Sequence, residues 1–80
     1  MTERELSTLI WLRVRDITTL LMHQKGVELR VAFNLVLGSE VFKLLADEKT
    51  KVWHYSVHML FELLQSELTT GVIELPETQA

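Results

Sequence analysis

Apolar residues recur at intervals of three and four through the first third of the chain, the spacing of one face of an α-helix. Thr2 and Glu5 form the pattern of a capping box, in which each side chain accepts a hydrogen bond from the other residue's backbone N–H. Gly26 stands where a helix ends in a left-handed residue. The pattern predicts a helix from Thr2 to about Lys25. Its core stripe would consist of Leu6, Leu9, Ile10, Val14, Ile17, Leu20 and Leu21.

The same helix carries a second, mixed face. Trp11, Arg15, Thr18 and Met22 lie at i, i+4, i+7 and i+11, so they share one side. Scattered surface hydrophobes are common on soluble proteins and explain Trp11 and Met22 without a function. The alternative is a partner surface anchored by Trp11, because tryptophan is enriched at interface hot spots. We favour the partner surface.

Two short helices follow in the pattern. Residues 27–37 are apolar except at a few positions, which predicts a short and largely buried helix. Gly38 and Ser39 interrupt it, and Ser39 is a good N-cap for a third helix, Glu40 to about Ala46. The residues expected to face inward from that helix are Val41, Phe42, Leu44 and Leu45.

The last helix should start at Lys49 or Thr50, after a polar connector, and end at Gly71. We predict one continuous helix; a break at Ser56, itself a plausible N-cap, is the open alternative. After Gly71 the stretch 72–75 alternates like a strand, until Pro76 stops it. The prediction is therefore an all-α domain of about four helices over residues 1–71, with a tail at 72–80.

Two histidines, His54 and His58, lie four residues apart in this last segment. On a continuous helix they would share the polar face with Glu62, opposite the face that holds Trp53 and Leu60. That spacing would let both imidazoles approach one metal ion. The segment lacks the H-E-x-x-H arrangement, and the chain has no cysteine. We therefore interpret both as solvent-exposed histidines and predict no metal and no cofactor.

The high hydrophobic content of the chain favours association with a second polypeptide. Of the 80 residues 48% are hydrophobic, and the mean hydropathy is +0.16, more apolar material than a small monomer readily buries. Disulfides are excluded because cysteine is absent. We expect a homodimer or a complex with a partner protein. The candidate interface residues are Trp11, Arg15, Met22, Trp53 and Phe61.

The sequence contains no clear motif of an enzyme active site. None of the four serines sits in a G-x-S-x-G elbow, and Ser39 and Ser56 are explained by helix capping. The three glycines each mark a helix boundary, which leaves no phosphate-binding loop. We predict a protein that is not an enzyme and has no evident small-molecule substrate.

The charge balance disfavours nucleic acid. The formal net charge is −3, and no lysine or arginine cluster lies along one segment. A helix-turn-helix over Val27 to Ala46 would offer Lys43 alone as a basic side chain on its second helix. A small nucleic-acid-binding transcriptional regulator remains the alternative function. No apolar run approaches the roughly 20 residues of a membrane span, so we expect a cytoplasmic protein of bacterial type.

Residues 38–71, GSEVFKLLADEKTKVWHYSVHMLFELLQSELTTG, resemble a pattern found in small uncharacterised bacterial helical proteins. The matching positions are Ser39, Phe42, Leu45, Asp47, Thr50, Trp53, Tyr55, Ser56, Leu64, Glu67, Leu68 and Gly71. Similar proteins are often encoded beside toxin-like partners. The resemblance implies that the chain binds another protein, as an antitoxin-like or regulatory component. His54 and His58 are not part of the pattern.

Overall fold

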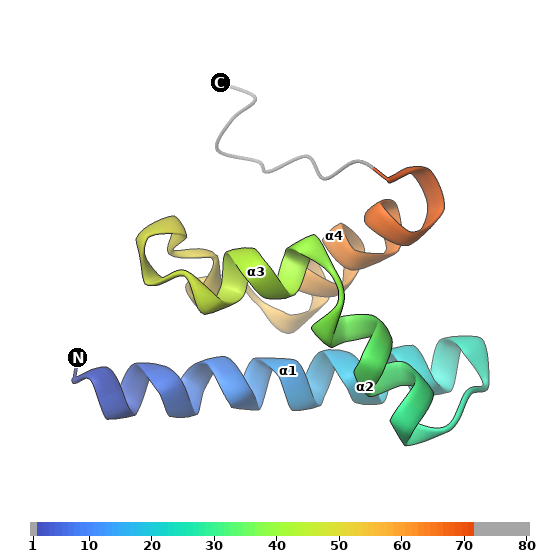
Figure 1. The fold of residues 1–80 in the computed structure, drawn as a ribbon, viewed down its shortest axis with the longest axis horizontal. Coiled ribbons are helices and arrows are strands. Elements are labelled where there is room, and N and C mark those ends of the chain that lie inside the picture. The colour runs from blue at the N-terminus through green and yellow to red at the C-terminus, as the bar shows by residue number, and fades with distance from the viewer. Residues whose placement is uncertain (1, 72–80) are drawn as a thin grey trace.

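The computed structural model describes residues 2–71, and every regular element in that range is helical (Figure 1). The prediction of an all-α bundle with four α-helices is confirmed. The predicted tail, residues 72–80, lies outside the described residues. The α-helices are α1 (Glu3–Lys25), α2 (Leu29–Leu37), α3 (Glu40–Ala46) and α4 (Val57–Thr70), and two 3₁₀ turns, η1 (Glu48–Thr50) and η2 (Val52–His54), precede α4.

The predicted limits of α1 are confirmed by its caps. The Thr2 hydroxyl accepts a hydrogen bond from the Glu5 N–H (3.1 Å), and the Glu5 carboxylate accepts one from the Thr2 N–H (3.3 Å). Gly26 has φ +65° and donates its N–H to the Met22 carbonyl (2.8 Å). A left-handed residue ends the helix at low cost only when it is glycine. Along α1 the buried stripe is Ile10, Val14, Ile17, Thr18 and Leu21.

The prediction that the segment 27–37 is largely buried is wrong. The helix begins at Leu29, and of its residues Ala32 and Val36 alone are buried. These two lie one turn apart on the narrow side that packs against the rest of the domain. The exposed residues of α2 include four large apolar side chains, Leu29, Val31, Phe33 and Leu35.

The prediction of one continuous last helix is also wrong, and the alternative of a break at Ser56 is correct. Lys51 adopts a left-handed conformation (φ 57°), and Tyr55 is extended. These turns bury Val52 and Tyr55 in the core. Ser56 then caps α4 by accepting the Met59 N–H (3.2 Å). Burying Val52 and Tyr55 thus stabilises the broken conformation more than a continuous helix would be stabilised by its apolar spacing.

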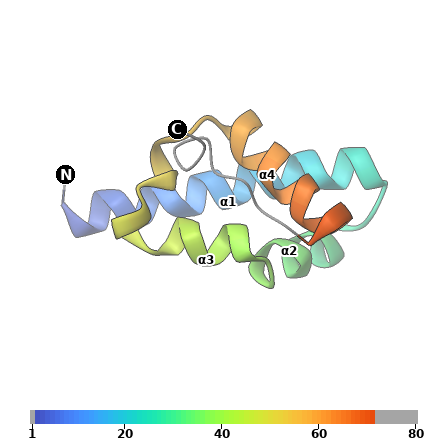
Figure 2. The same cartoon turned by 90° about the horizontal axis from the view of Figure 1, so that it is seen from above.

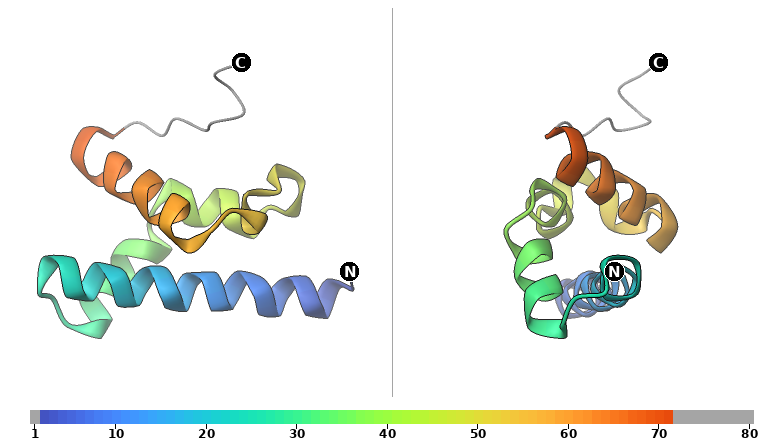
Figure 3. Two further views of the ribbon diagram at one scale, coloured as in Figure 1. Left: turned by 180° about the vertical axis from the view of Figure 1, so that it is seen from behind. Right: turned by 90° about the vertical axis from the view of Figure 1, so that its right-hand side faces the viewer.

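The helices form two layers (Figure 3). The long helix α1 is one layer, α3 and α4 lie over it, and α2 links the two layers at one end of the molecule. Seen from above, α2 and α3 follow one another along one side of α1 (Figure 2). The core between the layers includes Ile17, Leu21, Val36, Leu45, Leu60 and Leu64.

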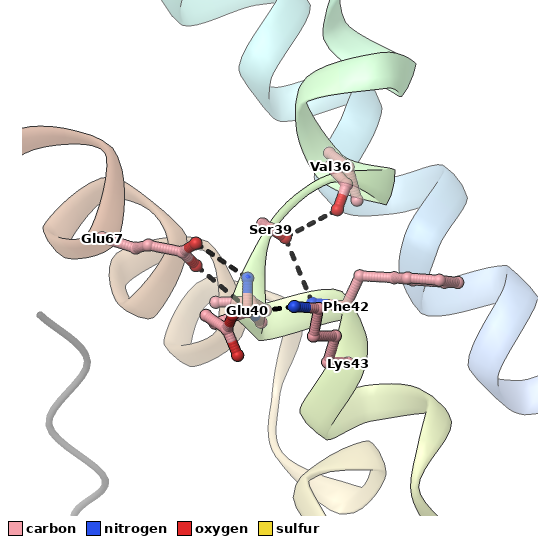
Figure 4. A network of polar contacts seen from close by, with 7 residues as sticks. Val36, Ser39, Glu40, Phe42, Lys43 and Glu67 are labelled. Carbon is pink, nitrogen blue, oxygen red and sulfur yellow. Dashed lines mark hydrogen bonds and ion pairs between the residues drawn. The ribbon is translucent and has the colours of Figure 1, made fainter. Parts of the chain in front are cut away.

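A polar network joins α3 to α4 (Figure 4). The Glu67 carboxylate of α4 accepts hydrogen bonds from the backbone N–H groups of Glu40 (2.7 Å) and Val41 (3.1 Å). The Ser39 hydroxyl accepts from the Phe42 N–H (3.1 Å) and donates to the Val36 carbonyl (2.6 Å). The first three N–H groups of α3, which no helical carbonyl can satisfy, therefore find partners within the chain.

Candidate functional site

Most of the exposed large apolar side chains belong to α1 and α2. Within residues 2–71, eight large hydrophobic residues are exposed, and six of them belong to these two helices. The other two, Met59 and Leu68, lie on α4. We call the six the α1–α2 surface: Trp11, Leu12, Leu29, Val31, Phe33 and Leu35.

A groove of about 500 Å³ runs between the two helices within this surface. Trp11 is 50% exposed and Leu29 is 61% exposed, so the walls stand half in solvent and the groove is shallow. We call it the α1–α2 groove. Its lining residues are Trp11, Val14, Arg15, Thr18 and Thr19 from α1 and Leu29, Arg30 and Phe33 from α2.

The floor of the groove is poor in free polar groups. Thr18 is buried and donates its hydroxyl to the Val14 carbonyl (2.7 Å). Thr19 does the same to the Arg15 carbonyl (3.0 Å). Both hydroxyl protons are therefore used within α1, and the floor favours apolar contact.

Trp11 links the groove to α3. Its ring lies 5.9 Å from the ring of Phe42, measured between centroids, with the planes tilted by 45°. Such a pair holds the indole in place, because aromatic contacts favour offset or tilted arrangements. Trp11 is thus a positioned side chain that still presents half of its area to solvent.

The charges at the groove are both positive. Arg15 contacts the Asp16 carboxylate through Nε (3.1 Å) and one terminal nitrogen (3.0 Å). Arg30 is exposed and has no ion-pair partner within residues 2–71. No acidic side chain of the described chain lines the groove. A cationic groove on a chain with net charge −3 is a local feature that composition does not reveal.

The five predicted interface residues divide into two groups. Trp11 and Arg15 lie together in the α1–α2 groove. Met22, Trp53 and Phe61 are half-buried and pack against the core instead. Trp53 is further held by a hydrogen bond from its Nε1 to the Glu48 carbonyl (3.2 Å). The expectation that these three side chains are exposed is corrected: each is partly buried against the core.

Sequence reasoning missed the apolar residues of α2: Leu29, Val31, Phe33 and Leu35. The signal was present, since seven of the nine residues of α2 are apolar, more than one buried face of a helix needs.

The two histidines do not form a helical pair. His54 belongs to η2, and His58 lies in the first turn of α4, beyond the extended Tyr55. The His54 ring packs edge-on near Trp53 and Tyr55, and its Nδ1 contacts the Lys51 carbonyl. Residues 2–71 contain no group of three His, Asp or Glu side chains placed to hold a metal ion.

None of the helices in the described range is both long enough and apolar enough to span a membrane. Comparison with protein-family models, with curated proteins and with solved structures gives no match.

Proposed function

We propose that this chain is a non-enzymatic protein–protein interaction module, which binds a second polypeptide through the α1–α2 surface. The second polypeptide is a further copy of the chain or a partner protein. One observation carries the proposal: four of the nine residues of α2 are large, apolar and exposed, and two of them, Leu29 and Phe33, line a groove with the exposed Trp11.

The number of exposed large apolar side chains on these two helices supports this function. A stable interface buries about 800 Å² on each partner, roughly one seventh of the 5402 Å² that the chain exposes. Contiguous apolar patches on monomers are small, and larger ones mark interaction sites. Trp11, which lines the groove, is of a residue type enriched among binding hot spots.

The local chemistry also fits a binding role better than a catalytic one. Ser39 and Ser56 are engaged as helix caps. A nucleophile needs a base within hydrogen-bond reach, and no histidine accepts from either serine in the described chain. These contacts support a protein that is not an enzyme.

The alternative of a nucleic-acid-binding regulator has less support. A recognition helix presents its N-terminal residues to the major groove. In this chain the N-terminus of α3 is occupied by the Glu67 carboxylate. The basic side chain of α3, Lys43, pairs with Glu40 (3.0 Å).

In its finer form the proposal is an antitoxin-like or regulatory component of the bacterial cytoplasm. The test is to purify the untagged chain gently from its own cells and measure its mass by light scattering. We expect a homo-oligomer or a stoichiometric complex, which the double variant Leu29→Gln/Phe33→Gln disrupts.

The matched control is Met59→Gln/Leu68→Gln, which removes exposed apolar side chains from α4. It should leave the assembly intact. A bare monomer from the wild-type chain, or equal behaviour of the two double variants, would contradict the proposal.

A further inference from the structure

We propose that the α1–α2 groove binds an amphipathic helix of a partner protein, with carboxylates flanking the apolar stripe of that helix. This inference rests on the proposed function and names the kind of partner. It draws on the shape of the groove, its depth and its charge.

The shape of the groove fits a helix. On α1 the lining residues fall at 11, 14, 15, 18 and 19, which is just over two turns or about 12 Å of helix. On α2 the opposite wall is formed by Leu29 and Phe33, one turn apart. Helices that dock in apolar grooves use anchors at i, i+4 and i+7, which span a similar length.

Other classes of occupant fit less well. A bound strand needs a sheet edge, and residues 2–71 contain no strand. A small molecule is usually enclosed over most of its surface, whereas Trp11 and Leu29 leave the groove open. A helix, which covers the groove from above, buries both side chains at once.

The positive charge of the groove favours binding of a helix that carries acidic side chains. Arg15 and Arg30 are the charged residues that line the groove, on opposite walls. A carboxylate of the occupant can bind either guanidinium by a charge-assisted hydrogen bond. The existing contact of Arg15 with Asp16 is exposed, and such ion pairs contribute little, so exchange of the arginine to a partner is not costly.

A second copy of the chain fits the charge pattern poorly. In a two-fold dimer the same patch lies against itself. Pairing the α1–α2 grooves in this way brings Arg15 and Arg30 of both copies onto one interface, where Asp16 pairs with Arg15 and no carboxylate among the lining residues pairs with Arg30. We therefore assign the groove to a different chain.

The experiment uses two designed helical peptides of about 15 residues, a length at which an isolated helix can form. Both carry leucines at i, i+4 and i+7; one has glutamates beside the leucines and the other has lysines. Binding of each labelled peptide to the full chain is followed by fluorescence anisotropy. We expect the glutamate peptide to bind at least about tenfold more tightly, equivalent to one decade of Kd.

The double variant Arg15→Glu/Arg30→Glu should reverse this preference. The control Lys43→Glu/Lys49→Glu makes the same change of net charge outside the groove and should preserve it. Equal binding of the two peptides, an unchanged preference in the groove variant, or no binding of either peptide would overturn the inference.

The solution mass of the wild-type chain distinguishes two negative results. One would exclude the acidic-helix partner alone, and the other would also exclude the proposed interaction surface. A dimer that excludes both peptides and dissociates in Leu29→Gln/Phe33→Gln would overturn the acidic-helix partner while supporting the interaction surface. A chain that neither dimerises, binds the peptides nor purifies with another protein would overturn both.

Discussion

At the scale of single residues, Glu67 is the clearest case of one side chain that joins two helices. Its carboxylate reaches from α4 to two N–H groups at the start of α3, 26 and 27 positions earlier in the chain. The sequence predicts that Ser39 caps α3, because that bond is local. It does not predict Glu67, because a glutamate near a helix end is usually solvated and its partner depends on the tertiary packing.

Replacing Glu67 with Gln should lower the free energy of unfolding by about 1 to 2 kcal/mol, since charge-assisted hydrogen bonds become neutral ones. Urea unfolding followed by circular dichroism measures the change. Glu62→Gln, at an exposed site on the same helix, is the control and should stay within about 0.5 kcal/mol. Equal effects of the two changes would mean that the Glu67 contacts do not stabilise the α3–α4 junction.

The core can be tested with a pair of leucines from α4. Leu60 is fully buried and Leu68 is 38% exposed. We expect Leu60→Ala to cost about 2 to 5 kcal/mol, because it leaves a cavity, and Leu68→Ala to cost less than about 1 kcal/mol. Thermal and urea unfolding of both variants provide the measurement. A large effect at Leu68 would place it in the core and remove it as a control site.

At the scale of elements, the sequence predicts those features that depend on nearby residues. The capping box of α1, the glycine ends of α1 and α4, and Ser39 at the start of α3 all follow from local hydrogen bonding. The break before α4 does not follow in the same way. Helical spacing favours continuity, whereas the burial of Val52 and Tyr55 and the Ser56 cap favour the break.

Ser56 should stabilise this break, because its hydroxyl caps α4. Ser56→Ala is expected to reduce stability by about 1 kcal/mol. Ser7→Ala, at an exposed site inside α1, should be neutral or slightly stabilising, since alanine is the better helix former. Chemical denaturation of both variants tests the pair, and a neutral Ser56→Ala would show that the cap does not stabilise α4.

At the scale of the whole molecule, the two tryptophans differ in burial and in the surfaces they contact. Trp53 packs against the core, and its indole N–H is hydrogen-bonded to the Glu48 carbonyl. Trp11 is half exposed at the groove. Trp11 lies within the long helix α1, whereas Trp53 lies in the 3₁₀ turn η2, which packs against the core.

Trp53→Ala should therefore lower the free energy of unfolding by about 2 to 4 kcal/mol, and Trp11→Ala by about 1 kcal/mol. Binding should show the reverse order, with a loss of about 2 kcal/mol or more for Trp11→Ala. Urea unfolding gives the first quantity. The second is the affinity for the glutamate peptide. A Trp11 variant that unfolds as readily as the Trp53 variant would make Trp11 a core residue.

The candidate site shows the limit of sequence reasoning at this scale. Trp11 and Arg15 are predicted from helical spacing, and the structure places both in the groove. The apolar residues of α2 are missed, because apolar periodicity predicts which residues are suited to burial and not whether the chain supplies something to cover them. That answer depends on the arrangement of all the helices, and here α2 lies at the edge.

Photo-crosslinking in cells tests most directly whether a second polypeptide binds the α1–α2 surface. Phe33 of the surface and Met59 of α4 are both 37% exposed, so a photo-crosslinking phenylalanine analogue can be placed at either site with matched accessibility. We expect irradiation of cells to yield a specific crosslinked protein from position 33 and none from position 59. Equal products from the two positions, or no product from position 33, would contradict it.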